Sequence, residues 1–244
     1  MNRISIVGCG WVGKALKEIL QEEYQVNCSV RGKLDEKSFY HVETMIIAIP
    51  PRGDYLQTLT HLLSYLSDDT QLILLSSTSV YPQTTGLVKE EDTHGITTPS
   101  LMLQAERLVL SIIYPKVLIL RLGGLMGYDR IAGKYTAGKT KAHDAPVNYI
   151  HRDDVVAIIK LCIDKGVKDN IFNVVAPSHP KQSEIYTKNA KIFGWENTYF
   201  ESDEVIGKVV SAGKLVEFFG YEFLKREPLL CSFITYPYFV SSPL

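Results

Sequence analysis

Cysteine is scarce in this chain, and its spacing carries no motif. The 244 residues include four widely separated cysteines without a C-x-x-C pair: Cys9, Cys28, Cys162 and Cys231. Zinc knuckles and disulfide-rich small domains require closely spaced cysteines, so the pattern argues against both. Five of the six histidines show no metal-ligand spacing either: His41, His61, His94, His143 and His179. We therefore expect no bound metal, no disulfides and a reducing, cytoplasmic location.

Long apolar runs and an excess of one charge sign are absent too. No apolar stretch is long enough to span a bilayer, and the first residues already have the pattern of a strand, so we expect neither a membrane segment nor a signal peptide. The formal net charge is −1 and no basic cluster exceeds a few residues, which excludes the field that gathers nucleic acid. A hydrophobic content of 45% is typical of a globular enzyme. We expect a small-molecule substrate and a monomer or homodimer.

Three glycines near the start give the strongest motif in the chain. An apolar run leads into G-x-G-x-x-G at residues 8–13, and a helix-patterned run follows. In a dinucleotide site, Gly8 permits the tight turn, Gly10 lets the backbone approach a pyrophosphate, and Gly13 lets the helix pack close to the strand. The helix N-terminus then presents N–H groups and a partial positive charge to the phosphates.

The sequence around the motif decides between a dinucleotide site and a glycine turn that binds nothing. Val12, Leu16 and Ile19 fall on one helical face, and a second strand follows over 26–30. Strand, glycine loop, helix and strand in this order favour dinucleotide binding. The cofactor-binding residues expected here are Gly8, Gly10, Trp11, Val12 and Gly13.

The end of the second strand sets which dinucleotide is preferred. An acid there would accept hydrogen bonds from the ribose 2′-OH of NAD, but this chain has Arg31, with Ser29 and Lys33 near it. A guanidinium forms charge-assisted, bidentate contacts with phosphate, so we expect Arg31 to bind the 2′-phosphate of NADP(H). The alternative is that Arg31 is a solvated loop cation. We favour NADP(H) over NAD(H).

Strand and helix patterns alternate along the rest of the chain. Short apolar runs typical of strands buried on both faces lie at 45–49, 72–75, 117–122 and 171–175. The alternation predicts an α/β fold, a Rossmann-type doubly wound parallel sheet. Ile49 ends the first of these runs, and Pro50 and Ser76 directly follow the first and second; we expect all three to border the cofactor crevice.

We divide the chain into two parts. Residues 1–176 are expected to form an NAD(P)-binding Rossmann domain, with a lobe insertion at about 123–150. Residues 177–244 are expected to form a small C-terminal substrate lobe packed on it. Only about seventy residues follow Val175, which favours a compact substrate over a bulky nucleotide-sugar.

Five segments match one known family in that family's order. They are Gly8-Cys9-Gly10-Trp11-Val12-Gly13, Ser76-Ser77-Thr78-Ser79-Val80-Tyr81, Arg121-Leu122-Gly123-Gly124-Leu125-Met126-Gly127, Asn148-Tyr149-Ile150-His151-Arg152-Asp153-Asp154 and Ile171-Phe172-Asn173-Val174. They cover about residues 4–176, and a weaker similarity extends over 208–221. The sequence resembles the extended and atypical short-chain dehydrogenase/reductases, the group that contains NAD-dependent epimerases and dehydratases. The resemblance implies a Rossmann fold and hydride transfer to or from a carbon that bears oxygen.

The family's chemistry implies three catalytic groups, of which this chain keeps one. A Ser or Thr polarises the substrate oxygen, and Ser77 occupies that position with Thr78 beside it. These hydroxyls could instead only cap the strand end. The family's proton-transferring Tyr and its Lys partner are absent, because the corresponding positions hold Thr98 and Met102. Tyr81 is the nearest phenol, and it either substitutes as proton donor or is a packed aromatic.

Other polar segments are weaker candidates for the site. Two Tyr-x-x-x-Lys strings, at 135–139 and 221–225, do not lie on the expected helix, and we reject both. His151 with Asp153 and Asp154 could form a metal site or an acid/base cluster, but Asp153 or Asp154 is a natural helix N-cap, which we favour. The cations of 130–141 could lie over a substrate pocket and attract an anionic group, although a solvated loop is the simpler interpretation.

The leading hypothesis is an NADP(H)-binding oxidoreductase or epimerase/dehydratase-like protein of the atypical short-chain class, acting on a small oxygen-bearing substrate. The alternative is a catalytically inactive NAD(P)-binding redox sensor or interaction module. The missing Tyr-Lys pair favours the alternative, and the hydroxyl cluster at 76–79 favours the enzyme.

Overall fold

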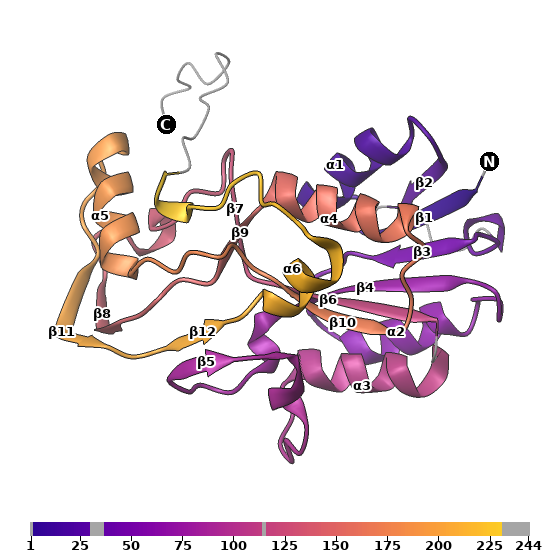
Figure 1. The fold of residues 1–244 in the computed structure, drawn as a ribbon, viewed down its shortest axis with the longest axis horizontal. Helices are drawn as coiled ribbons and strands as arrows, with labels where there is room; N and C mark the ends of the chain where they lie inside the picture. Colours follow the sequence, from indigo (N-terminus) through magenta and orange to yellow (C-terminus); the bar gives the residue numbers. More distant parts are fainter. Residues whose placement is uncertain (1, 30–36, 114–115, 231–244) are drawn as a thin grey trace.

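A six-stranded parallel sheet forms the centre of the computed structural model, which describes residues 2–29, 37–113 and 116–230 (Figure 1). The strand order is β10-β6-β4-β3-β1-β2. The strands are β1 (Arg3–Val7), β2 (Gln25–Ser29), β3 (Thr44–Ile47), β4 (Gln71–Ser77), β6 (Val117–Leu122) and β10 (Asn170–Val174). Each apolar run that predicted a strand is part of this sheet, so the predicted α/β fold is confirmed.

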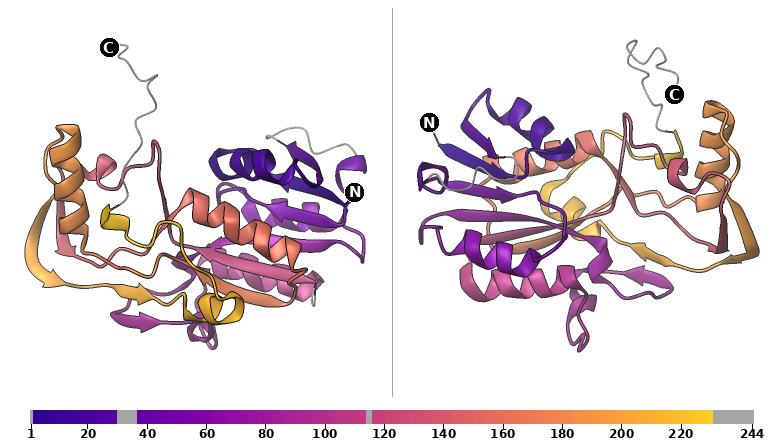
Figure 2. Two further views of the ribbon diagram at one scale, coloured as in Figure 1. Left: turned by 45° about the horizontal axis from the view of Figure 1, so that its top comes forward. Right: turned by 180° about the vertical axis from the view of Figure 1, so that it is seen from behind.

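Helices cover both faces of the sheet. On one face α1 (Trp11–Leu20) packs against α4 (Arg152–Asp164), and on the other α2 (Tyr55–Leu63) packs against α3 (Leu101–Ile113) (Figures 1 and 2). The sheet is therefore doubly wound, as predicted. Strand order reverses between β1 and β3, and the connections leave these two strands in opposite directions. In such sheets a crevice opens outside the carboxyl ends of the two strands.

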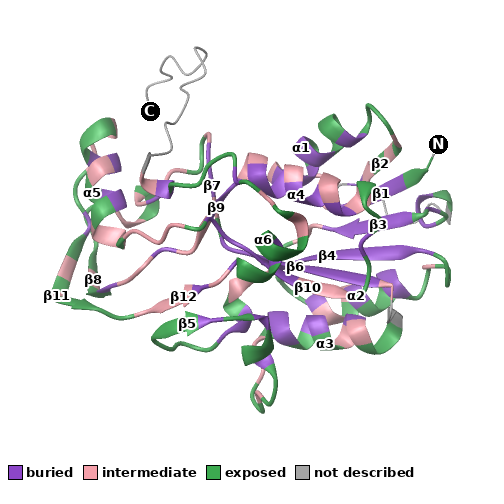
Figure 3. Cartoon of the chain, in the orientation of Figure 1, coloured by how far each residue is buried: buried purple, intermediate pink, exposed green. Residues whose placement is uncertain are grey.

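Burial on both faces explains why the strands contain so few polar residues. Ile6, Ile46 and Ile73 lie side by side on β1, β3 and β4, and each is completely buried. Figure 3 shows the buried colour running along the central strands, and the exposed colour on the outer surfaces of the helices. A strand enclosed in this way has no solvent face that would require alternating polar residues.

Most of the remaining elements lie toward the carboxyl edge of the sheet (Figure 1), whereas η1 (Lys37–Phe39) precedes the start of β3. The strands are β5 (Gly86–Val88), β7 (Gly124–Met126), β8 (Thr140–Asp144), β9 (Tyr149–His151), β11 (Tyr199–Val205) and β12 (Lys208–Val210), and the helices are α5 (Gln182–Phe193) and α6 (Gly213–Phe219). Single 3₁₀ turns are η1 (Lys37–Phe39), η2 (Thr78–Val80), η3 (Glu90–Thr93), η4 (Lys134–Thr136) and η5 (Pro228–Leu230). The short strands pair in parallel as β11–β8, β12–β5 and β7–β9. No helix of the described residues is long and apolar enough to cross a membrane.

A second, small hydrophobic core lies beyond that edge. It contains Ala132 and Val147 from the predicted insertion, and Ile185 and Tyr186 from the segment after residue 176. The same C-terminal segment also returns to the main body, where Leu215 of α6 is buried in the principal core. The chain after 176 thus contributes to both cores, and the predicted domain boundary stays a prediction.

The start of α4 differs from the expectation. His151, and not an acid, is the N-cap, and its Nδ1 accepts a hydrogen bond from Asp153 N at 3.2 Å. Asp154 is completely buried, and its carboxylate accepts hydrogen bonds from Tyr221, Leu224 N and Lys225 N. Asp154 therefore holds the C-terminal segment against α4.

The expectation that the cysteines are unpaired is wrong for one pair. Cys9 and Cys28 form a disulfide, with Cα atoms 5.5 Å apart. The parallel pairing of β1 with β2 places Cys28 beside Ile6 and brings it close to the glycine loop, a contact between distant residues that cysteine spacing does not reveal. Cys162 is buried and free. The cysteine pattern consequently gives no support to a reducing location.

We predict that this disulfide stabilises the fold measurably. It closes a loop of 19 residues, and a loop of that length corresponds to about 3 kcal/mol of unfolding free energy in the chain-entropy model. Urea unfolding with and without excess dithiothreitol should show that loss for the natural chain. The Cys9→Ser/Cys28→Ser double variant is the control and should respond little to the reductant. A natural chain that is equally stable in both conditions would contradict the prediction.

Candidate functional site

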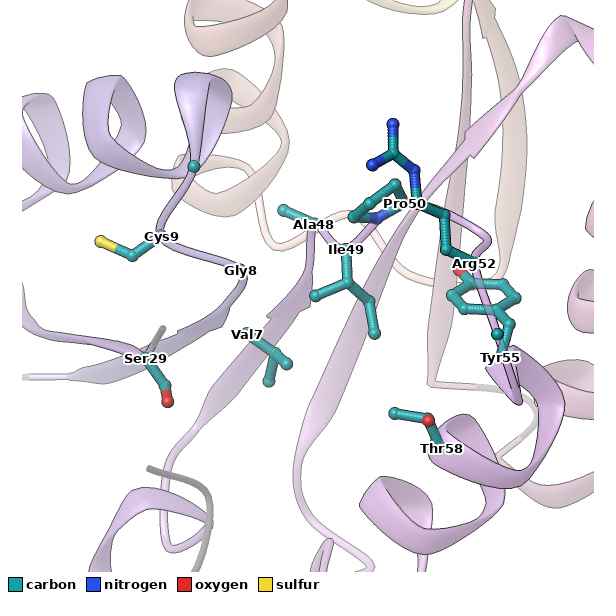
Figure 4. A pocket seen from close by; sticks show the side chains of 12 residues that line it. Val7, Gly8, Cys9, Ser29, Ala48, Ile49, Pro50, Arg52, Tyr55 and Thr58 are labelled. Carbon is teal, nitrogen blue, oxygen red and sulfur yellow. The ribbon is translucent and has the colours of Figure 1, made fainter. Parts of the chain in front are cut away.

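A cleft of about 620 Å³ opens at the carboxyl edge, where the strand order reverses (Figure 4). It is lined by residues of β1 and the glycine loop, the end of β2, the loop after β3 and the first turns of α2: Val7, Gly8, Cys9, Gly10, Ser29, Ala48, Ile49, Pro50, Arg52, Gly53, Tyr55 and Thr58. Figure 4 shows Cys9 and Ser29 on one side of this cleft, and Arg52, Tyr55 and Thr58 on the other. We call it the first cleft.

The three motif glycines have distinct steric environments. Gly8 has φ +109°, and a Cβ there would lie 2.7 Å from the Ala48 carbonyl oxygen. A Cβ on Gly13 would lie 2.1 Å from the Gly8 oxygen, so any side chain would push α1 away from the loop. A Cβ on Gly10 would meet nothing within 4 Å. Gly8 and Gly13 are thus required by packing, while Gly10 leaves its backbone open to the cleft.

Hydrogen bonds fix the glycine loop against the end of β2. The backbone nitrogens of Gly8 and Cys9 both donate to the Ser29 carbonyl oxygen, at 3.1 and 3.0 Å. Helix α1 begins directly after the loop at Trp11 and has no acid in its first turn. Its positive end is therefore not offset by a carboxylate of its own, which suits a phosphate.

The first cleft has a cationic character. Among the described residues that line it, Arg52 carries a charge and no acid occurs. Arg52 is exposed and belongs to the loop between β3 and α2. The sequence predicts that the loop containing Arg52 borders the cofactor crevice, but it does not single out Arg52, Tyr55 or Thr58 as site residues.

The predicted cofactor residues fall into three groups. Gly8, Gly10, Ile49 and Pro50 line the first cleft; Trp11, Val12, Gly13 and Ser76 do not; and Arg31 lies outside the described residues. Val12 and Gly13 are buried in the first turn of α1, where Gly13 fits the helix against the loop. Direct contact of any of these residues with a cofactor stays a prediction.

Ser76 belongs to a buried polar network behind the sheet edge. Its hydroxyl donates to Glu106 Oε1 at 2.5 Å, and the same carboxylate accepts from Arg121 Nη2 at 2.8 Å. The Arg121 and Glu106 side chains are almost fully buried, with 1% and 2% exposure respectively. Ser76 therefore points toward α3.

Tyr81 belongs to the same network. Its hydroxyl donates to Asn173 Oδ1 at 2.6 Å and accepts from Arg121 Nη1 at 2.9 Å. Burial raises the pKa of Tyr81 to about 12, so the phenol is neutral at physiological pH. This environment favours the packed-aromatic interpretation over the proton-donor interpretation.

Ser77 and Thr78 lie at the end of β4, half-buried. Ser77 Oγ accepts a hydrogen bond from Ser79 N at 3.1 Å and so caps η2. Accepting this bond uses a lone pair and leaves the hydroxyl proton able to donate. The capping and substrate-polarising roles proposed for Ser77 are therefore compatible.

Thr98 and Met102, which stand at the positions of the family's Tyr and Lys, do not replace that acid/base pair. Thr98 is exposed in a loop, and Met102 is buried in α3 at 4% exposure. Of the two rejected strings, Tyr135 lies in η4 and Tyr221 donates to Asp154. Within the described ranges, no group of three or more His, Cys, Asp or Glu residues could hold a metal ion.

A second cleft of about 350 Å³ lies beside the small core, where the sequence signal was the cationic segment 130–141, a weak candidate for lying over a substrate pocket. It is lined by Leu125, Met126, Arg130, Ile131, Ala132, Gly133, Tyr135, Thr136, Tyr149 and Tyr186. The Tyr149 and Tyr186 hydroxyls are 3.0 Å apart, and burial raises the pKa of both phenols. The first cleft thus lies at the carboxyl edge of the sheet itself, and the second among the elements beyond it.

Solved structures share this architecture. The chain has the fold of the short-chain dehydrogenase/reductase superfamily, including the NAD-dependent epimerases and dehydratases. A candidate NAD-dependent epimerase/dehydratase of Methylobacillus flagellatus superposes with a TM-score of 0.75 at 22% identity, over 93% of this chain and 94% of that one. The dTDP-glucose 4,6-dehydratase of Bacillus anthracis, solved in complex with NAD, gives 0.72 at 14% identity over 94% of each chain.

A curated relative is similar along nearly the whole chain. It is protein YeeZ of Escherichia coli K12, which is 29% identical over an alignment that covers 94% of this chain and 98% of YeeZ. No family model matches the chain.

We predict that Gly10→Glu abolishes dinucleotide binding. The position has ordinary extended backbone angles and open space, so the variant should fold, but its carboxylate would occupy and repel the pyrophosphate position. Calorimetric titration with NADPH measures the loss. Gly10→Ala is the matched control and should bind nearly as well as the natural chain. Undiminished affinity of Gly10→Glu would show that the loop is only a turn.

Proposed function

We propose that this protein is an NADP(H)-binding oxidoreductase or epimerase/dehydratase-like protein of the atypical short-chain class, acting on a compact oxygen-bearing substrate. The observation that carries the proposal is the first cleft. Its glycine loop, helix N-terminus and β3 end converge at the switch point of a doubly wound sheet, which is where this architecture binds dinucleotides. The NAD complex of the Bacillus anthracis dehydratase supports the same cofactor class.

The residues present fit a dinucleotide. The open backbone at Gly10 and the start of α1 would hold the pyrophosphate, and Ile49 and Pro50 would form the apolar wall of the first cleft. A nicotinamide cofactor, when bound, supplies or accepts a hydride. The protein's contribution is to orient the cofactor and substrate and to exclude water from the carboxyl edge.

Electrostatics support NADP(H) as the preferred cofactor. The described residues that line the first cleft include Arg52 and no acid, so nothing among them repels an additional phosphate. Ser29 lies on that lining at the end of β2, and Arg31 follows it two residues later in the sequence. We propose that Arg31 binds the 2′-phosphate, which requires it to face the cleft.

We propose that Ser77 polarises the substrate oxygen. Its hydroxyl is half-buried at the carboxyl end of β4, and no acceptor for its proton occurs among the described residues. A hydroxyl in this state can donate to an oxygen on which negative charge develops. Thr78 follows as the next hydroxyl on the same loop.

A second candidate function, binding without turnover, is favoured by one observation. The phenol nearest the expected site, Tyr81, is sequestered, and Met102 fills the position of the family's lysine. A protein of this kind would bind the oxidised and reduced cofactor differently and so respond to the cofactor's redox state. Cofactor-dependent turnover in a screen of small carbonyl compounds and sugar nucleotides separates the two functions.

We predict that Ser77→Ala lowers turnover by about ten- to a thousandfold, the range for losing one transition-state hydrogen bond. The loss should fall on kcat more than on KM, because the bond strengthens as charge develops. Ser79→Ala, which alters an exposed hydroxyl on the same turn, is the control and should keep near-natural turnover. Unchanged turnover in Ser77→Ala would limit Ser77 to its capping role.

We predict that the natural chain binds NADPH about ten- to a hundredfold more tightly than NADH. A charge-assisted bidentate contact contributes about 1.5–3 kcal/mol, and about 1.4 kcal/mol corresponds to one decade of affinity. Arg31→Ala should erase most of this preference while leaving NADH affinity nearly unchanged. Arg52→Ala is the comparator: it lies across the first cleft from Ser29 and should weaken both dinucleotides alike (Figure 4). Equal binding of both cofactors by the natural chain would contradict the assignment of Arg31.

A further inference from the structure

We propose that the second cleft binds an anionic group of the substrate, a carboxylate or a phosphate, and that Arg130 is the residue that holds it. The proposal deepens the proposed function, since it assigns a substrate class to the same protein. Among the described residues lining this cleft, Arg130 is the one with a charge. The remaining lining is apolar or hydroxylated.

A tight turn fixes the position of Arg130. Gly127 and Arg130 exchange backbone hydrogen bonds of 3.1 and 3.0 Å, which closes a four-residue turn. Tyr128, inside the turn, has φ +56°, a left-handed conformation that a bulky residue rarely adopts. Gly127 has φ +115°, and a Cβ there would lie 2.3 Å from the His151 ring. The surrounding structure thus imposes this turn at a conformational cost.

The turn is held to two helices. Asp129 accepts a hydrogen bond from Trp11 Nε1 at 2.8 Å, which ties it to the start of α1. The Tyr128 hydroxyl bonds the Asp153 carboxylate at 2.9 Å, which ties it to the start of α4. The Arg130 guanidinium stacks 4.4 Å from the centre of the Trp11 ring. A guanidinium held on an aromatic ring loses less freedom when it binds an anion.

The charge of Arg130 is not neutralised by a neighbouring acid. No carboxylate of the described residues lies within 4.0 Å of its nitrogens, and the adjacent Asp129 is directed to the indole. The side chain remains exposed. Arg130 therefore keeps the five N–H donors that recognise a planar carboxylate or a phosphate.

The hydroxyl groups of the second cleft suit an oxygen-bearing substrate. When one of Tyr149 and Tyr186 donates to the other across 3.0 Å, the acceptor keeps its own proton free for a ligand. Burial raises the pKa of both phenols, so they remain neutral donors. The cleft thus offers one cationic anchor, a phenolic donor and an apolar wall.

The volume limits the size of the ligand. At about 350 Å³ the second cleft lies near the lower end of ligand pockets, which span about 300–1,000 Å³. The substrate class that fits is a compact hydroxy or oxo compound with one carboxylate or phosphate. The lysines of 134–141 do not line the cleft, so this recognition rests on Arg130.

The test uses inorganic phosphate and malonate as probes, with glycerol as the neutral control, by calorimetric titration. The measurements are made on Gly10→Glu, whose carboxylate blocks the glycine loop, and on the natural chain saturated with NADPH. The first condition blocks the glycine loop and the second fills the first cleft, and the Arg130 variants below assign the remaining anion binding to the second cleft. We expect at least one anion to bind and glycerol to bind much more weakly. The preferred anion distinguishes a carboxylate from a phosphate.

Adding Arg130→Gln should weaken anion binding by about ten- to a hundredfold, and Arg130→Lys should recover part of it. Lys134→Gln, which removes a nearby exposed cation, is the matched control and should change binding less than about twofold. Equal binding with and without the Arg130 side chain, or no anion binding at all, would overturn the proposal.

Failure of the proposed function would give a different result. It would show as no NADPH binding by the natural chain, whereas anion binding in the Gly10→Glu background would still depend on Arg130.

Discussion

A buried guanidinium imposes the arrangement of the sheet edge. Arg121 of β6 is 1% exposed, and a buried charge is stable only when it is paired and fully hydrogen-bonded. Its donors reach the Glu106 carboxylate, the Glu90 carbonyl, Thr93 Oγ1 and the Tyr81 hydroxyl. These acceptors come from α3, from η3 and from Tyr81, which directly follows η2. The three segments must therefore fold around the Arg121 side chain.

This network also determines which hydroxyls remain available at the site. Ser76 and Tyr81 are committed to the network through Glu106, Arg121 and Asn173. Successive side chains on a strand point to opposite faces, so Ser77 points away from the side that Ser76 occupies. The loop that the family resemblance marks as catalytic therefore contains both structural and exposed hydroxyls. The distinction depends on partners far away in sequence, and the motif alone cannot supply it.

The fold was predictable because its determinants are local. Apolar runs mark strands enclosed on both faces, and the glycine spacing marks a turn in which Gly8 and Gly13 have no room for a Cβ. The features that were missed arise from contacts between distant segments. Cys9 meets Cys28 only after β1 pairs with β2, and the second cleft forms only when the insertion meets α5. The sequence favours Asp153 or Asp154 as the N-cap of α4, but His151 is the cap and Asp154 holds the C-terminal segment.

Trp11 connects the two clefts physically. It directly follows Gly10 of the first cleft, yet its indole contacts Asp129 and Arg130, of which Arg130 lines the second. Each cleft has a single arginine among its charged lining residues and no acid among those described. Under the proposed function, a dinucleotide and an anionic substrate would repel each other as they approach, and separate cations at Arg52 and Arg130 would offset that repulsion. The turn holds Arg130 against Trp11, the first residue of α1, at the conformational cost of a left-handed Tyr128, and so fixes a cation of the second cleft beside the glycine loop of the first.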